Sequence, residues 1–236
     1  MPDDVLDNEM LSKMVDTNDE WITTRVGIKE RRILKDESKG SSYLGTKAVE
    51  RLLESTSTKP EEIDLVICAT SNPDYRFPST ASVIAYETKL TNAYAYDIQA
   101  ACAGFIVTMQ AARAYIQSGL YKKVIVVTAE KMSSMTDYED RATCPLFGDA
   151  AAAVLVEPTE ENLGVIDGEF HIDGSGLPHL LMKAGGSARP ASAETVAARE
   201  HFIYQEGRVV YKNAVRDMLS STLSVMQRNN LTVEEV

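Results

Sequence analysis

Segments with a strand-like apolar pattern alternate with helix-like segments along the first two thirds of the chain. The run IDLVICAT at 63–70 is continuously apolar, which is typical of a parallel strand buried on both faces. Further strands are expected at 93–98, 122–130 and 147–158, and helices at 42–53, 78–89 and 103–118. Because strands alternate with helices, the pattern predicts an α/β fold with a mostly parallel sheet covered on both faces.

This alternation loosens after residue 158, where turn-forming glycines become frequent. Apolar residues recur at helical spacing near the end, which predicts an amphipathic helix at 209–229. Thr232 and Glu235 then have the spacing of a helix capping box, so another element is expected where the sequence ends. We therefore expect an N-terminal half over 1–158 and the beginning of a second, incomplete half over 159–236.

The net negative charge of the chain argues against a nucleic-acid partner. The 236 residues include 24 Lys and Arg against 35 Asp and Glu, a formal net charge of -11 at pH 7. A nucleic-acid-binding protein needs a basic surface, so that function is not expected. No apolar run is long enough to span a bilayer, and the N-terminus is acidic rather than signal-like. The sequence predicts a soluble, cytoplasmic protein without a membrane segment.

The cysteines and histidines form no recognisable metal or disulfide pattern. Three cysteines without CxxC spacing predict neither a disulfide framework nor a metal site. Cys68 lies in an apolar strand and is expected in the core, whereas Cys144, in the loop before a proline, is expected to be accessible but without an activator. Any histidine of the second half could meet a cysteine by folding, although for each taken alone an ordinary surface or core polar role is favoured: His171, His179 and His201.

Cys102 has the most informative surroundings. It follows a predicted strand through a tight turn of small residues and stands at the start of a predicted helix. Unpaired amides and the positive end of the helix dipole favour a thiolate there, and the thiolate is the nucleophilic form. The small neighbours leave room for a substrate, and their N–H groups could help to hold an oxyanion: Ala100, Ala101, Ala103 and Gly104. The alternative is a small buried hydrophobic residue, the usual role of a free cysteine.

Four motifs, in this order, resemble those of the β-ketoacyl-acyl carrier protein synthase III family. They are DTNDEWITTRVGIKERRI at 16–33, SNPDYRFPSTA at 71–81, DIQAACAGF at 97–105 and DRATCPLFGDAAAAVL at 140–155, with a weaker match at 204–215. The resemblance implies a thiolase-like fold of two related halves, a homodimer and no metal or other cofactor. It also implies the condensation of a short acyl-CoA with malonyl-acyl carrier protein, through an acyl-cysteine, to start fatty acid chains.

The resemblance assigns roles to single residues. Cys102 matches the acyl-accepting cysteine. Trp21 and Arg141 match residues that sandwich the adenine of coenzyme A, and Arg25 and Thr17 match nearby nucleotide contacts. Flat aromatic and guanidinium groups stack on a purine, and arginine pairs with phosphate, so the chemistry is consistent. Without the resemblance, partial core packing for the tryptophan and a solvated surface charge for each arginine would be favoured.

Further residues follow from the same matches. Phe77 matches a residue that reaches across the dimer to close the acyl pocket, where plain interface packing is the alternative. Gly207 and Tyr211 match positions that line the tunnel for the pantetheine arm. Lys212 and Arg216, one helical turn apart, offer an acidic carrier protein a local positive face, and an ordinary solvated helix face is the alternative.

The chain also departs from the family pattern. The family's catalytic histidine and asparagine lie after the position that corresponds to Val236, and the family's first strand precedes the N-terminus. We therefore expect a chain truncated at both ends, with little condensing activity but with self-acylation of Cys102 still open to it. Two rivals remain: another thiolase-fold condensing enzyme, of the polyketide starter or hydroxymethylglutaryl-CoA synthase type, and a noncatalytic binding or dimerisation module.

Overall fold

The structure is a computed structural model that describes residues 1–161 and 163–236. Its contacts divide the chain into two compact units, each described by itself below. The first unit comprises residues 1–8, 28–134 and 147–165, and the second comprises 9–27, 135–146 and 166–236. The units are therefore not contiguous in sequence, unlike the expected halves 1–158 and 159–236, whose division stays a prediction.

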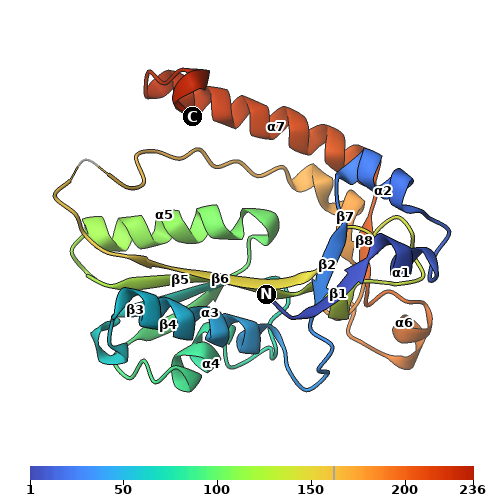
Figure 1. The fold of residues 1–236 in the computed structure, drawn as a ribbon, viewed down its shortest axis with the longest axis horizontal. Helices are drawn as coiled ribbons and strands as arrows, with labels where there is room; N and C mark the ends of the chain where they lie inside the picture. The colour runs from blue at the N-terminus through green and yellow to red at the C-terminus, as the bar shows by residue number, and fades with distance from the viewer. Residues whose placement is uncertain (162) are drawn as a thin grey trace. The chain divides into compact units, whose positions relative to one another are not determined.

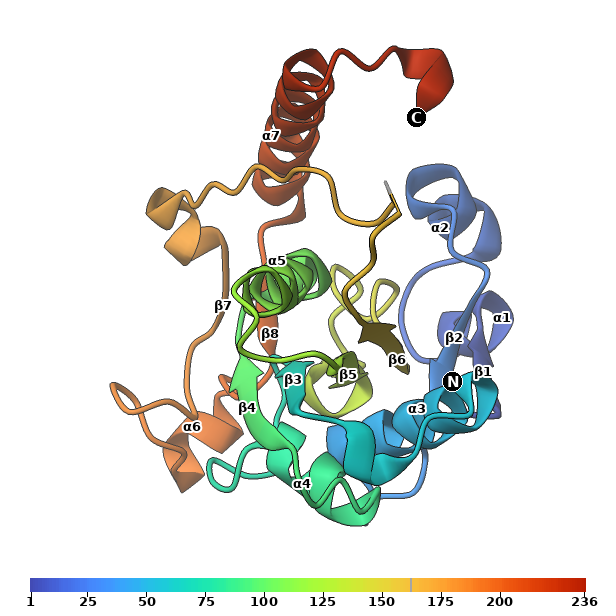
Figure 2. The same ribbon diagram turned by 90° about the vertical axis from the view of Figure 1, so that its left-hand side faces the viewer.

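A four-stranded sheet forms the centre of the first unit. Its strands are β3 (Leu65–Ala69), β4 (Tyr94–Ile98), β5 (Val124–Lys131) and β6 (Asp149–Val156), in the order β4-β3-β5-β6. Figure 2 shows this order. Strand β3 is parallel to both of its neighbours, and β6 is antiparallel to β5. The prediction of a mostly parallel sheet is confirmed.

Helices cover both faces of this sheet. In Figure 1, α3 (Ser41–Thr56) and α4 (Thr80–Glu87) lie on one face and α5 (Gly104–Gln117) lies on the other. Successive residues of β3 point to opposite faces, so Val66 and Cys68 join one core cluster while Leu65 and Ile67 join the other. Because both faces are buried, the strand needs apolar residues at every position, as the sequence has at 63–70.

The predicted helices are present with small shifts at their ends. Helix α4 begins at Thr80 rather than Pro78, because the Asp97 carboxylate accepts hydrogen bonds of 2.7 Å from the Thr80 and Ala81 amides. The Ser79 side chain accepts a further bond from the Ser82 amide and caps the same end. A carboxylate from the end of β4 thus satisfies amides that a helix start leaves unpaired.

A second, smaller sheet in the first unit was not predicted. Strand β1 (Asp4–Asp7) pairs antiparallel with β2 (Glu30–Ile33). Both strands have only four residues and carry charges, so no apolar alternation marks them in the sequence. The first unit also has the 3-10 turns Pro60–Glu62 and Ala101–Ala103. Helix α1 (Asn8–Ser12) and the 3-10 turn Met132–Met135 each span a boundary between the two units in the sequence.

The second unit is built mainly from helices. It contains α2 (Asp19–Val26), α6 (Ala193–Ala197) and α7 (Gly207–Arg228), with strands β7 (Leu180–Met182) and β8 (Ile203–Gln205) paired antiparallel. Helix α7 agrees with the prediction at 209–229, and none of its residues is buried. The 3-10 turns Gly174–His179 and Val233–Glu235 complete the unit, and the latter has the predicted capping box.

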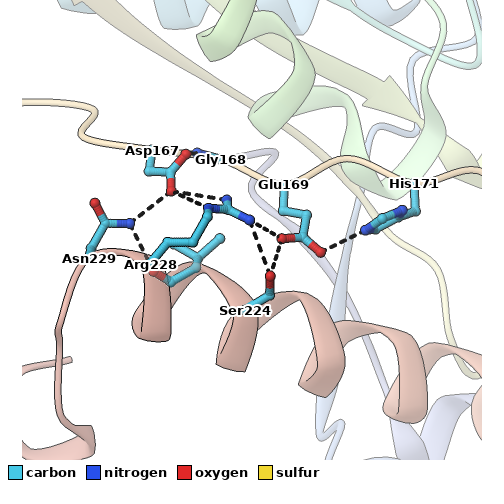
Figure 3. A network of polar contacts seen from close by, with 8 residues as sticks. Asp167, Gly168, Glu169, His171, Ser224, Arg228 and Asn229 are labelled. Atoms are coloured by element: carbon cyan, nitrogen blue, oxygen red, sulfur yellow. Dashed lines mark hydrogen bonds and ion pairs between the residues drawn. The ribbon is translucent and has the colours of Figure 1, made fainter.

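Hydrogen bonds and ion pairs between polar side chains connect the segment around Glu169 to α7, as Figure 3 shows. Arg228 donates to Glu169 and, at 3.0 Å, to Asp167. Ser224 and His171 also contact the Glu169 carboxylate. Hydrogen bonds from His171, then Ser224 and Arg228, lower the pKa of Glu169 to about 2, so this carboxylate is charged at neutral pH.

No helix in the described part of the chain is long and apolar enough to cross a membrane.

Candidate active site and nucleotide cluster

Cys102 lies on the turn between β4 and α5. Strand β4 ends at Ile98, the 3-10 turn Ala101–Ala103 follows, and α5 begins at Gly104. The thiol therefore stands in the turn just before the helix rather than inside it. Cys102 is exposed and forms no disulfide, so a reagent in solution can reach its sulfur.

The backbone of this turn is tight. Ala101 has a φ of 46°, in the left-handed region that residues with a side chain usually avoid. At Gly104, an added Cβ would lie 2.8 Å from the Ala69 Cβ at the end of β3. A glycine is thus required for α5 to begin so close to the sheet, and this close approach fixes where the turn holds Cys102.

Two of the four amides beside Cys102 that could help to hold an oxyanion are already hydrogen-bonded within the turn. The Ala103 N–H donates to the Ala100 carbonyl at 3.1 Å, and the Gly104 N–H donates to the Ala101 carbonyl. These two amides are used to close the turn. The Ala103 and Gly104 amides are therefore not free donors for an oxyanion.

The other two cysteines are buried. Cys68 is fully buried in β3, as predicted, and burial raises its pKa well above the ordinary thiol value. The prediction that Cys144 is accessible was wrong, because this residue has no exposed surface. Its loop folds back on itself, and the Cys144 amide donates to the Asp140 carbonyl at 3.0 Å. Of the three cysteines, Cys102 alone is exposed.

Trp21 lies close to two arginines in the second unit. Helix α2 carries Trp21 and, one turn later, Arg25, whose Cζ lies 4.6 Å from the centroid of the indole ring. Arg141, far away in the sequence, brings its Cζ to 5.0 Å from the same ring. Arg141 also pairs with Asp16 at 3.5 Å. The structure therefore brings together three residues that the family resemblance assigned to one nucleotide site.

Thr17, just before α2, has a buried hydroxyl that forms no hydrogen bond within the described residues. Buried polar atoms without a partner are rare in proteins, so the polar atom of a ligand is a suitable partner for this one. Together with a flat indole ring and two guanidinium groups, it gives the cluster the means to stack on an aromatic base and to pair with phosphate.

The remaining candidates lie on two other segments. Gly207 is the first residue of α7, and Tyr211, one turn later, is 71% exposed. Lys212 and Arg216 are exposed on the same helix, but Arg216 donates to the neighbouring Asp217 at 2.6 Å, which offsets part of its charge. Phe77, in the first unit, is 86% exposed.

The three histidines all lie in the second unit. His171 contacts Glu169 and His179 contacts Glu206, each at 2.7 Å. The Nδ1 atom of His201 is buried and has no hydrogen-bond partner within the described residues. No group of three or more His, Cys, Asp or Glu side chains in the described part of the chain has the arrangement of a metal site.

Comparison with known proteins places these features in a family. The family model for 3-oxoacyl-[acyl-carrier-protein] synthase III matches residues 96–174, which include Cys102 and Arg141. A β-ketoacyl-[acyl-carrier-protein] synthase III of Porphyromonas gingivalis is 53% identical over 236 residues, covering 100% of this chain and 70% of the relative. The chain belongs to the β-ketoacyl-acyl carrier protein synthase III family. A second synthase III, from Bacteroides thetaiotaomicron, is 54% identical with the same coverage.

Solved structures of this family agree with the fold. The synthase III of Aquifex aeolicus matches with a TM-score of 0.88 and 41% identity, covering 100% of this chain and 71% of that structure. The enzyme from Thermus thermophilus matches with a TM-score of 0.89 and 37% identity, with the same coverage. The predicted thiolase-like α/β fold of a condensing enzyme is confirmed.

Sequence reasoning missed two residues that shape these sites. Asp16, which pairs with Arg141, stands in a polar run where nothing marks it as a partner. Gly104 was noted only as a small neighbour of Cys102, whereas the structure shows that it sets the distance between α5 and β3. Its signal was present, since glycine is a poor helix former that rarely begins a buried helix without a packing reason.

Proposed function

We propose that Cys102 accepts the acyl group of a short acyl-CoA, acetyl-CoA in the first instance, in the condensation that starts fatty acid chains. The observation that carries the proposal is the place of the thiol. Cys102 is the one exposed cysteine of the three, and it stands on a tight turn directly before a helix. A cysteine attacks as its thiolate, and an exposed thiol can be reached by a thioester from solution.

The proposed reaction has two steps. The Cys102 thiolate attacks the carbonyl carbon of the acyl-CoA thioester, a new carbon–sulfur bond forms, and coenzyme A leaves as a thiolate that takes up a proton. Malonyl-acyl carrier protein then loses carbon dioxide, and the resulting carbanion attacks the acyl-cysteine carbonyl. The new carbon–carbon bond gives 3-oxoacyl-acyl carrier protein and releases the Cys102 thiolate. The thioester itself supplies the electrophile and the leaving group, so the scheme includes no metal or other cofactor.

Coenzyme A binding is assigned to the cluster around Trp21. We propose that its adenine stacks between Trp21 and Arg141, with Arg25 and Thr17 in further nucleotide contacts. Two arginines already lie within cation–π distance of the indole, and the Thr17 hydroxyl is buried without a partner within the described residues. Because Arg141 already contacts the indole, a base that stacks between the two must displace its guanidinium from the ring.

Further parts of the proposal rest on the family resemblance. Phe77 is assigned to the acyl pocket of a partner in a homodimer, and Gly207 and Tyr211 to the pantetheine tunnel. Lys212 and Arg216 are assigned to docking of an acidic carrier protein. The location proposed for this function is the cytoplasm. Charge reversal at Lys212 and Arg216 together tests the docking surface, and unchanged affinity for the carrier protein would reject it.

The test of the proposed function is self-acylation with radiolabelled acetyl-CoA. Wild-type protein and a Cys68→Ala variant should retain the label after denaturation, whereas Cys102→Ala should not. The Cys68 variant is the matched control, since it removes a thiol that is buried in the core. Absence of label on the wild type would instead support a noncatalytic module.

The identity of the primer is tested in the same assay. One solved relative is the priming β-ketosynthase of the R1128 polyketide pathway, with 31% identity and a TM-score of 0.86 over 100% of this chain and 69% of that structure. Acetyl-CoA should therefore be compared with longer and branched acyl-CoA thioesters as competitors. A clear preference for a longer primer would favour the polyketide starter alternative over the initiation of fatty acid synthesis.

A further inference from the structure

Arg199 has an unusual backbone conformation in the second unit. Helix α6 ends at Ala197, Ala198 caps it, and Arg199 follows with a φ of 59°. Glycine is the usual residue in the left-handed position after a helix, because a side chain there strains the backbone. An arginine at such a position suggests that its side chain has a task that glycine cannot perform.

The guanidinium of Arg199 forms hydrogen bonds and ion pairs with the loop that carries Arg141. Its Nε donates to Asp137 Oδ2 at 2.8 Å and its Nη2 donates to Asp137 Oδ1, so the pair is bidentate across 62 residues of sequence. A further ion pair joins Arg199 to Glu139 at 3.2 Å. The Asp137 side chain is only 13% exposed. The hydrogen bond from Arg199 lowers the pKa of this carboxyl, so it stays charged at neutral pH.

Asp137 in turn shapes the chain up to Arg141. Its Oδ1 accepts from the Glu139 amide at 2.8 Å, and its carbonyl accepts from the Asp140 amide at 3.1 Å. Asp140 then accepts from the Ala142 amide at 2.9 Å, on the other side of Arg141. Hydrogen bonds thus run from the Arg199 side chain through two aspartates to the residues on both sides of Arg141.

We propose that Arg199 is a positioning residue for the nucleotide cluster: through Asp137 it fixes the turn that presents Arg141 to the ring of Trp21. Without these contacts, the turn could hold the backbone of Arg141, which is itself exposed, in several positions, and a ligand would have to select one of them. Fixing the loop before binding removes that ordering cost. The assignment to nucleotide binding rests on the proposed function, whereas the coupling of Arg199 to Arg141 and Trp21 does not.

The coupling can be measured without any ligand, because Trp21 is the single tryptophan of the chain. Acrylamide quenching of its fluorescence reports how well the arginines cover the indole. Arg199→Ala should increase the quenching constant toward that of Arg141→Ala. The double variant should show no more quenching than Arg141→Ala alone, because both changes remove the same contact.

Two variants separate positioning from a merely structural role. Arg199→Gly suits the left-handed backbone, so it should melt at a higher temperature than Arg199→Ala, which loses the same ion pairs, while it increases quenching to the same extent. Arg189→Ala is the matched control: it removes another exposed arginine of the same unit, which pairs with Glu200 and Glu194, and it should leave quenching unchanged. Unchanged quenching in both Arg199 variants, or an additive double variant, would overturn the inference.

Coenzyme A binding completes the test. Titration calorimetry should show about threefold weaker binding for Arg199→Gly than for wild type, a smaller loss than for Arg141→Ala, as expected when the turn that carries Arg141 is no longer pre-ordered. The rate of self-acylation at saturating acetyl-CoA should not change, so the effect falls on KM and not on kcat. If wild type binds no coenzyme A while the quenching pattern holds, the proposed function fails and the coupling of Arg199 to Arg141 stands. Equal affinity of wild type and Arg199→Gly would overturn the positioning role in binding.

Discussion

Replacing Gly104 with alanine should strongly slow the acylation of Cys102 while it lowers the stability of the fold only slightly. The new Cβ would lie 2.8 Å from the Ala69 Cβ, about 0.6 Å inside the 3.4 Å at which ordinary contact begins. Ala69 belongs to a buried strand and cannot withdraw, so the start of α5 and the adjoining turn must move. Overpacking of this kind costs about 1–3 kcal/mol, and alanine returns up to about 1 kcal/mol through its helix propensity.

The net loss of stability at Gly104 is therefore about 1 kcal/mol, visible as a lower urea midpoint. The displaced turn carries the nucleophile, and a 1 Å misplacement can slow a reaction by about a hundredfold, so a decrease on the order of tenfold in the acylation rate is expected. The rate is measured by quenched-flow labelling with radiolabelled acetyl-CoA.

Gly119→Ala is the matched control for this prediction. Gly119 follows the C-cap of the same helix with a φ of +72°, and an added Cβ would meet nothing within 4 Å. Backbone strain should lower stability by about 1 kcal/mol, with no change in the acylation rate. A Gly104→Ala variant that acylates at the wild-type rate, or a Gly119→Ala variant that slows equally, would refute the reasoning.

Three further results are expected. Arg141→Ala should weaken coenzyme A binding by about 1 kcal/mol, roughly fivefold in titration calorimetry, because one stacking partner of the base is lost; unchanged affinity would count against the nucleotide cluster. A thiol reagent such as DTNB should modify Cys102 quickly and the two buried cysteines only after denaturant is added; more than one fast thiol in the native protein would contradict the burial. Hydrogen bonds, first from His171, hold the pKa of Glu169 at about 2, below the ordinary value of 4.5 for a glutamate. The stability from this carboxylate is thus present above about pH 4.5 and is lost as pH falls toward 2, and Glu169→Gln should flatten the pH dependence of the urea midpoint over that range.

The sheet of the first unit was predictable because its strands are buried on both faces. Strand β3 needs apolar residues at every position, and that requirement is visible as a continuous run in the sequence. Strands β1 and β2 were missed for the opposite reason. They are short and charged, and β2 buries Arg31, which hydrogen-bonds Asn8. When two polar strands that are far apart in the sequence pair, no periodic pattern of apolar residues marks them.

The site was predictable only in part. The position of Cys102 followed from local pattern, since a turn of small residues between a strand and a helix can be read directly. The meeting of Trp21 with Arg141 did not follow from spacing and came from the family resemblance alone. The burial of Cys144 was predicted wrongly, because a loop residue is assumed to be accessible until the fold of the loop is known.

The central claim is that Cys102 is the residue that takes the acyl group, and peptide mass spectrometry tests it most directly. Trypsin places the three cysteines in three different peptides, with Cys102 alone in residues 90–113. After incubation with acetyl-CoA, the account predicts one added acetyl group, found on that peptide and removed by hydroxylamine. An acetyl group on either of the other cysteine peptides, or an unmodified 90–113 peptide from a folded protein that binds coenzyme A, would contradict it.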